Sequence, residues 1–177
     1  MQHTHFFLIA LLASCTKEEL ELAYTNQEKK IEEFVNSQTS QHPEYTVANN
    51  SGVTRLTVSE GSGESLGENG TATIFYAAYN FSRSTIDNAS LIVTNNKDIA
   101  SGAGWDTSDE SKFVEAEINP SESGLLAGLA LGLPGIEAGE ECLILFSGRY
   151  GTGKESSGTI PANTSLAYRI WVMQVKN

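Results

Sequence analysis

The segment 125–141 reads LLAGLALGLPGIEAGEE, and it decides how the rest of the chain is interpreted. Gly128 and Gly132 interrupt its apolar run, and glycine lets a short helix lie close against a sheet because it carries no side chain. Residues 138–140 then have the composition of a turn, and residues 142–146 form a continuous apolar run typical of a buried strand. We therefore predict a short buried helix, then a turn, then a core strand.

The segments on either side of this helix carry the pattern of β-strands. Apolar and polar side chains alternate there, and β-branched and aromatic residues are frequent, in segments 53–58, 71–79, 113–118 and 166–175. Residues 80–112 are polar and predict a long loop with at most one short strand, at 91–93. The chain is thus predicted to be an α+β protein, with an antiparallel sheet around one short helix.

The N-terminal part of the chain predicts a separate helix over residues 17–38. Its apolar residues recur at helical spacing with charged residues between them: Leu20, Tyr24, Ile31 and the pair Phe34 and Val35. A polar stretch and Pro43 follow, which is typical of a helix end. The apolar stripe fits two interpretations. It packs on the following domain, or it pairs with the same helix of a second copy to form a homodimer.

The first residues have the features of a secretory signal. Residues 6–13 (FFLIALLA) are apolar but too few to span a bilayer as a helix. Residues 12–15 (LASC) resemble the lipobox of bacterial lipoproteins, which implies cleavage before Cys15 and diacylation of its thiol. A fortuitous apolar N-terminus with an ordinary cysteine is the alternative. Residues 16–19 (TKEE) are similar to the signal that sends some Bacteroidetes lipoproteins to the outer face of the outer membrane.

The chain is therefore predicted to have three parts. Residues 1–14 are a lipoprotein signal peptide, residues 15–44 a lipid-anchored helix and linker, and residues 45–177 a folded domain. The lipid on Cys15 would attach the chain to a membrane without spanning it. The predicted location is the bacterial envelope, on the periplasmic or outer face of the outer membrane.

The composition argues against several classes of function. The 177-residue chain carries a formal net charge of -11, which disfavours nucleic acid and anionic membrane surfaces as partners. Without the signal, His42 is the only histidine and Cys142 the only free thiol, so acid–base triads, zinc sites and thiol chemistry are not expected. Residues 148–154 (GRYGTGK) nearly match a phosphate-binding loop, but Glu155 stands where a Ser or Thr is required.

The domain resembles FKBP-type peptidyl-prolyl isomerases. The segment 125–141 matches, without a gap, the family pattern V-I-x-G-W-x-x-G-L-x-x-M-x-x-G-E. Residues 158–168 resemble the I-P-P-N-x-x-L-x-F pattern before the last strand, and residues 70–76 resemble G-x-x-V-x-V-x-Y. The likeness extends over residues 45–175 and implies an FKBP-like fold, in which a curved antiparallel sheet wraps around one short helix. The N-terminal helix and the lipobox also suit FKBP-type lipoproteins.

The resemblance implies a protein that binds a proline-containing segment in an apolar cup and needs no cofactor or metal. Rotation about the Xaa-Pro bond breaks amide resonance, at a cost of about 18–20 kcal/mol. An apolar cup favours the twisted, less polar amide over the planar one. The residues that the resemblance assigns to the cup are Tyr76, Val93, Thr94, Leu125, Leu126, Leu129, Tyr150, Thr152, Ile160 and Tyr168.

Some of these positions depart from the family pattern. Leu129 replaces the Trp at the floor of the cup, Thr94 replaces an Asp, and Thr152 aligns with the Tyr that hydrogen-bonds the substrate carbonyl. Tyr150 can replace this Tyr only if its loop shifts. The sequence therefore fits an isomerase that assists the folding of exported proteins, or a catalytically degenerate FKBP-like binding or chaperone module. A purely structural surface lipoprotein is a third reading.

Overall fold

The computed structural model describes the backbone of residues 4–177 and the side chains of residues 17–177. The elements follow in the order α1 (Thr4–Gln41), β1 (Thr46–Asn50), β2 (Val53–Ser59), β3 (Thr71–Asn80), β4 (Leu91–Thr94), α2 (Lys97–Gly102), η1 (Glu110–Lys112), β5 (Ala116–Ile118), α3 (Ala127–Gly132), β6 (Glu141–Phe146), η2 (Gly148–Tyr150) and β7 (Leu166–Lys176). The α+β prediction, with its antiparallel sheet, short helix and N-terminal helix, is confirmed.

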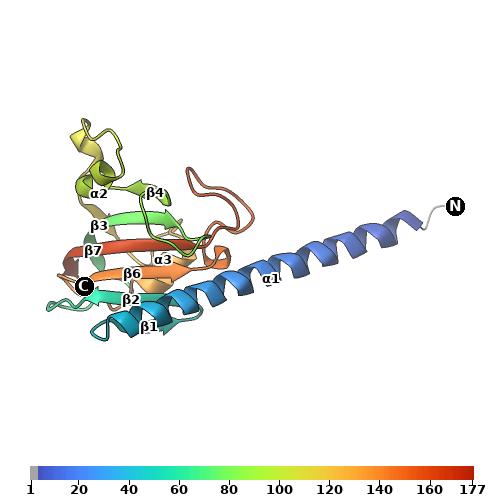
Figure 1. The fold of residues 1–177 in the computed structure, drawn as a ribbon, viewed down its shortest axis with the longest axis horizontal. Helices are drawn as coiled ribbons and strands as arrows, with labels where there is room; N and C mark the ends of the chain where they lie inside the picture. Colours follow the sequence, from blue (N-terminus) through green and yellow to red (C-terminus); the bar gives the residue numbers. More distant parts are fainter. Residues whose placement is uncertain (1–3) are drawn as a thin grey trace.

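All neighbouring strands of the sheet are antiparallel. The strand order is β1-β2-β6-β7-β3-β4, and β5 also pairs with β3. β5 pairs with the first half of β3, at 72–74, and β4 with its second half, at 77–79, so the two short strands share one edge of β3. Figure 1 shows the long strands β7 and β3 beside one another, with α3 behind the sheet.

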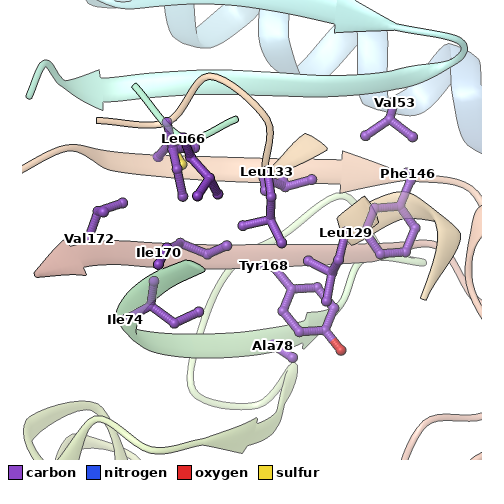
Figure 2. Close-up of a cluster of buried hydrophobic side chains, with 14 of the residues drawn as sticks. Val53, Leu66, Ile74, Ala78, Leu129, Leu133, Phe146, Tyr168, Ile170 and Val172 are labelled. Carbon is purple, nitrogen blue, oxygen red and sulfur yellow. The ribbon is translucent and has the colours of Figure 1, made fainter. Parts of the chain in front are cut away.

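The strand β6 is continuously apolar because both of its faces are covered. Cys142, Ile144 and Phe146 pack in the cluster that contains Leu129 and Leu133 of α3 and its surroundings, drawn in Figure 2. The intervening side chains, those of Leu143 and Leu145, belong to a second cluster on the other face of the sheet. Side chains alternate between the two faces of a strand, so a strand that is buried on both faces has apolar residues at successive positions instead of an alternating pattern.

Two glycines allow α3 to lie close to β6. A Cβ atom added at Gly128 would overlap the ring of Phe146, and one added at Gly132 would overlap the side chain of Ile144. Both glycines are buried. The predicted reason for the glycines in the 125–141 segment is therefore confirmed.

The helix α1 covers the second cluster. Tyr24, Ile31 and Val35 are buried, and Ile31 and Val35 pack with Leu56, Leu143 and other residues of the sheet. Figure 1 shows the C-terminal half of α1 lying along the domain while its N-terminal half projects away from it. The interpretation that the apolar stripe packs on the domain is confirmed for this half. The homodimer stays a prediction.

Two elements differ from the sequence-based expectation. The helix begins at Thr4 rather than at 17, and the polar segment 80–112 holds α2 in addition to the expected short strand. Asn96 caps α2, because its side chain accepts hydrogen bonds from the backbone N–H groups of Asp98 and Ile99. Only Ala100 of this helix is buried, so it lacks the apolar periodicity by which helices are found.

The predicted signal peptide and lipid anchor lie in residues 1–15, and the structure describes side chains only from residue 17 onward. Residues 1–3 are not described, and Cys15 lies in α1 at a position where the structure describes only the backbone. Within the described part of the chain, no helix has both the length and the apolar character needed to cross a membrane.

Candidate functional site

A hollow of about 370 Å³ opens between α3 and the concave face of the sheet; we call it the cup. Strands β3, β4, β5 and β7 contribute to its walls, together with the segment that leads into α3 and the loop between β6 and β7. Its lining residues are Ile74, Tyr76, Val93, Ala116, Glu117, Ile118, Glu122, Gly124, Leu125, Leu126, Leu129, Ser157, Ile160, Tyr168 and Ile170.

The floor of the cup is built from two neighbouring strands and α3. Tyr168 of β7 pairs with Ala78 of β3, and Tyr76 is two residues away on the same face of the sheet, so the two tyrosine rings lie 6.3 Å apart. The ring of Tyr168 also stacks on Phe146, with 6.0 Å between ring centroids. Figure 2 shows this ring beside Leu129, with its hydroxyl directed away from the aliphatic cluster.

The Tyr168 hydroxyl is a neutral hydrogen-bond donor. Burial of the ring, with a smaller contribution from nearby Tyr76, raises the pKa of Tyr168 to about 12. Among the described residues, neither this hydroxyl nor that of Tyr76 makes a hydrogen bond to the protein. The cup therefore offers two tyrosine hydroxyl groups to a ligand within an apolar surround.

Asn95 fixes the backbone of β3 at Tyr76. Its side-chain Oδ1 accepts a hydrogen bond from the Tyr76 N–H (2.6 Å), and its backbone N–H donates to the Tyr76 carbonyl (3.2 Å). Its Nδ2 donates to the carbonyl of Val114 at 2.9 Å. β5 pairs with β3 before Tyr76, and β4 pairs with it after Tyr76. Asn95 therefore supplies hydrogen bonds to β3 in the gap between these two short strands. Sequence reasoning missed this residue, because its role depends on where β4 and β5 end.

Thr94 supports the same strand and does not line the cup. It is buried, its Oγ1 donates a hydrogen bond to the Tyr76 carbonyl (2.6 Å), and the same oxygen accepts one from the Asn96 N–H (2.9 Å). The resemblance assigned Thr94 to the cup. In the structure it bonds to the backbone of Tyr76 and does not face the cup, so it would affect a ligand only through the position of Tyr76.

The sequence matches no known protein family and no curated protein. Solved structures are similar to it. FkpA from Escherichia coli has 18% identity and a TM-score of 0.56, over 99% of this chain and 71% of that one. A peptidyl-prolyl cis-trans isomerase from Pseudomonas syringae pv. tomato has 14% identity and a TM-score of 0.57, over 89% and 96%. The N-terminal domain of FKBP42 from Arabidopsis thaliana has 22% identity and a TM-score of 0.52, over 75% and 92%.

The chain has an FKBP-like fold. Identities this low establish the fold alone, so the chemistry of the FKBP-like domain has to be argued from its own cup. Most of the positions assigned by resemblance do meet there: Tyr76, Val93, Leu125, Leu126, Leu129, Ile160 and Tyr168.

Tyr150 and Thr152 do not line the cup of this FKBP-like domain. The Tyr150 ring packs over Gly52, and its hydroxyl is 2.7 Å from where a Cβ of Gly52 would lie. The Oγ1 of Thr152 donates a hydrogen bond to the carbonyl of Pro161 at 3.1 Å. The tyrosine hydroxyl groups available to a ligand are therefore those of Tyr76 and Tyr168.

Several lining residues were not assigned in advance. The alternation of 71–79 places Ile74 on the same face as Tyr76, and that of 113–118 places Ala116 and Ile118 together, so the sequence did carry a signal for them. Glu117 and Glu122 are exposed carboxylates at the rim. The sequence pattern gave no reason to place them near the cup.

The described residues include no group of three His, Cys, Asp or Glu side chains placed to hold a metal ion. Cys142 is fully buried in the core, and this burial raises the pKa of its thiol well above the ordinary value. A protonated, inaccessible thiol is unreactive. The chemistry of the cup is that of apolar side chains, hydroxyl groups and backbone N–H groups, with two carboxylates at its rim.

Proposed function

We propose that this chain is an FKBP-type peptidyl-prolyl cis-trans isomerase that binds a proline-containing segment in the cup. The observation that carries the proposal is the meeting of Tyr76, Leu129 and Tyr168 in one apolar hollow of about 370 Å³ on an FKBP-like fold. This volume lies in the range of pockets that take small ligands, about 300–1,000 Å³.

The cup would act by stabilising the twisted amide. The planar Xaa-Pro amide is more polar than the twisted one, so removing it from water into an apolar cup disfavours the planar form. The Leu126 N–H precedes α3 and donates to no backbone carbonyl within residues 17–177, so it is free to bind a substrate carbonyl. The neutral Tyr168 hydroxyl is a second donor. No proton is transferred and no covalent bond to the chain forms.

An exchange NMR assay with short Xaa-Pro peptides tests the proposal. We expect micromolar protein to accelerate cis–trans exchange, and Tyr76→Ala to abolish the acceleration. Met173→Ala, on the exposed part of β7, is the matched control and should leave the rate unchanged. Leu129→Trp, which supplies the family's aromatic floor, should raise the rate.

Each other outcome has a definite meaning. Line broadening of the peptide without acceleration of exchange would identify the catalytically degenerate binding module instead. Neither binding nor acceleration at micromolar protein would rule out both functions. An effect of Met173→Ala as large as that of Tyr76→Ala would place the activity outside the cup.

We further propose that the chain is a lipoprotein that assists the folding of exported proteins at the bacterial envelope. The support is the LASC segment, residues 12–15, in the N-terminal half of α1, the helix whose C-terminal half packs on the cup-bearing domain. Metabolic labelling with palmitate, followed by separation of the membranes, tests it. Label and membrane association should be lost in Cys15→Ser and kept in Cys142→Ser. Retention of label in Cys15→Ser would refute the anchor.

A further inference from the structure

One wall of the cup is carried by the β6–β7 loop, residues 147–165. Ser157 and Ile160 line the cup from the outer part of this loop, and they are joined by two backbone hydrogen bonds, of 3.0 and 2.9 Å. Residues 154–159 are exposed, so the outer part has little packing of its own. The position of this wall therefore depends on how the base of the loop is held.

The two ends of the loop meet at Gly148 and Asn163. A Cβ atom on Gly148 would lie 2.6 Å from the carbonyl carbon of Asn163, so the two backbones are in close contact. Asn163 has a φ of 54°, in the left-handed region that non-glycine residues rarely occupy. The Asn163 N–H also donates to the carbonyl of Gly153 (2.6 Å), and the Gly153 N–H donates to the carbonyl of Gly148 (3.1 Å).

A single side chain of α1 joins these two ends. The Oε1 of Gln27 accepts a hydrogen bond from the Gly148 N–H (2.8 Å), and its Nε2 donates one to the Asn163 carbonyl (2.7 Å). The Tyr24 hydroxyl, one turn earlier, donates to Oδ1 of Asn163 at 2.9 Å. A side-chain amide suits this bridge because its oxygen accepts a hydrogen bond while its nitrogen donates one.

Charged side chains also join α1 to the start of the loop. Arg149 pairs with Glu21 (2.9 Å) and Glu28 (3.3 Å) of α1, and its guanidinium lies 5.3 Å from the centre of the Tyr24 ring. The Ser147 hydroxyl donates to Glu28 at 2.9 Å. The side chains of these ion pairs are 35–48% exposed, so the pairs orient the loop more than they stabilise the fold.

From these contacts we propose that α1 is a positioning element of the cup, with Gln27 as its central residue. By bridging Gly148 and Asn163, Gln27 fixes the base of the β6–β7 loop and so the placement of Ser157 and Ile160 against the rest of the cup. The role in substrate affinity rests on the proposed isomerase function; the role in ordering the loop does not. The floor residues Tyr76, Leu129 and Tyr168 are outside its influence because other elements carry them.

The test compares Gln27→Ala with Gln41→Ala in the full chain. Gln41 is the same residue type on the same helix, and among the described side chains it bonds only to Ser37, one turn away. In Gln27→Ala, amide hydrogen exchange at Ser157 and Ile160 should become at least about tenfold faster, because two hydrogen bonds at the loop base are lost. Exchange in β3 and β7 should not change. In the isomerase assay, KM should rise about five- to tenfold with kcat nearly unchanged.

Further variants keep the proposal open to refutation. Tyr24→Phe removes one hydroxyl and should show the same pattern, smaller. Gln27→Glu keeps the acceptor for Gly148 and should recover part of the loop protection, and it replaces Gln27→Ala if that variant does not fold. Equal exchange rates in Gln27→Ala and Gln41→Ala, or faster exchange throughout the sheet, would overturn the proposal. A wild type without activity would refute the isomerase function alone, since the exchange data still decide the role of α1.

Discussion

At the scale of single residues, Gly128 sets how deeply α3 enters the concave side of the sheet. Any side chain there meets the Phe146 ring, which in turn supports Tyr168 at the floor of the cup. We expect Gly128→Ala to lower the free energy of unfolding by about 1–3 kcal/mol, the usual effect of overpacking a core. Urea unfolding followed by tryptophan fluorescence measures it.

The control for this change is Gly102→Ala. Gly102 ends α2, and an added Cβ would meet nothing within 4 Å. It should be neutral or stabilise by up to about 1 kcal/mol, since alanine restricts the unfolded chain more than glycine does. Equal destabilisation by both changes would show that the contact with Phe146 is not the cause.

Tyr168 makes the stability depend on alkaline pH. Its pKa is raised from 10.0 to about 12 in the folded protein, so the unfolded chain loses this proton first as the pH rises. The stabilisation is complete below about pH 10 and is lost between about pH 10 and 12, by up to about 3 kcal/mol. Urea unfolding at pH 9 and at pH 11.5 should show a smaller loss for Tyr168→Phe than for the wild type. Equal losses would mean that Tyr168 ionises normally.

At the scale of elements, α1 is held by a few buried side chains. Ile31 is 4% exposed and packs against the second cluster, whereas Leu22 on the same helix is 62% exposed. We expect Ile31→Ala to cost about 2–5 kcal/mol because it leaves a cavity, and Leu22→Ala to cost less than about 0.5 kcal/mol. Thermal unfolding by circular dichroism compares them. A small effect of Ile31→Ala would mean that α1 is not part of the folded unit.

The elements that the sequence predicted are those with a buried face. Strands β3, β6 and β7 and the helix α3 are all covered by the core, so their apolar patterns are complete. The strand β1 has five exposed residues and no alternation to detect. It forms because it pairs with β2. A strand that depends on pairing alone, without a buried face, leaves no apolar pattern in the sequence.

The cup was predictable where its residues lie on regular elements. The resemblance assigned Tyr76, Tyr168 and Leu129 to the cup, and all three lie on strands or on α3. Tyr150 and Thr152 lie in the β6–β7 loop, the shape of which is set by contacts between Gly148 and Gln27, 121 positions apart in the chain. A motif alignment carries no information about such a contact.

At the scale of the whole molecule, the chain has a formal net charge of -11, and the charged residues that line the cup are also acidic. Glu117 and Glu122 lie at its rim, and no Lys or Arg is among the described residues that line it. A peptide with Lys next to proline should therefore bind several-fold more tightly than one with Glu there at about 20 mM salt. The difference should largely vanish at about 500 mM salt, where charges are screened beyond about 4 Å.

Isothermal titration with the two peptides measures this preference. The double variant Glu117→Gln and Glu122→Gln should bind both peptides alike at low salt. Glu60→Gln with Glu64→Gln removes the same charge from exposed positions outside the cup and serves as the control. A preference that survives in the first double variant would assign it to the net charge rather than to the rim.

The position of β7 has a consequence for how the protein is made. Residues 166–176 emerge from the ribosome after all the other strands, yet β7 lies between β6 and β3 and joins the two halves of the sheet. Before β7 has been synthesised, β1, β2 and β6 can pair with one another, and β3, β4 and β5 can pair with one another. No strand of the first group pairs with a strand of the second. A chain cut short before residue 166 would therefore lack the strand that joins the two fragments, and we expect it to be cut by proteases faster than the chain that includes β7.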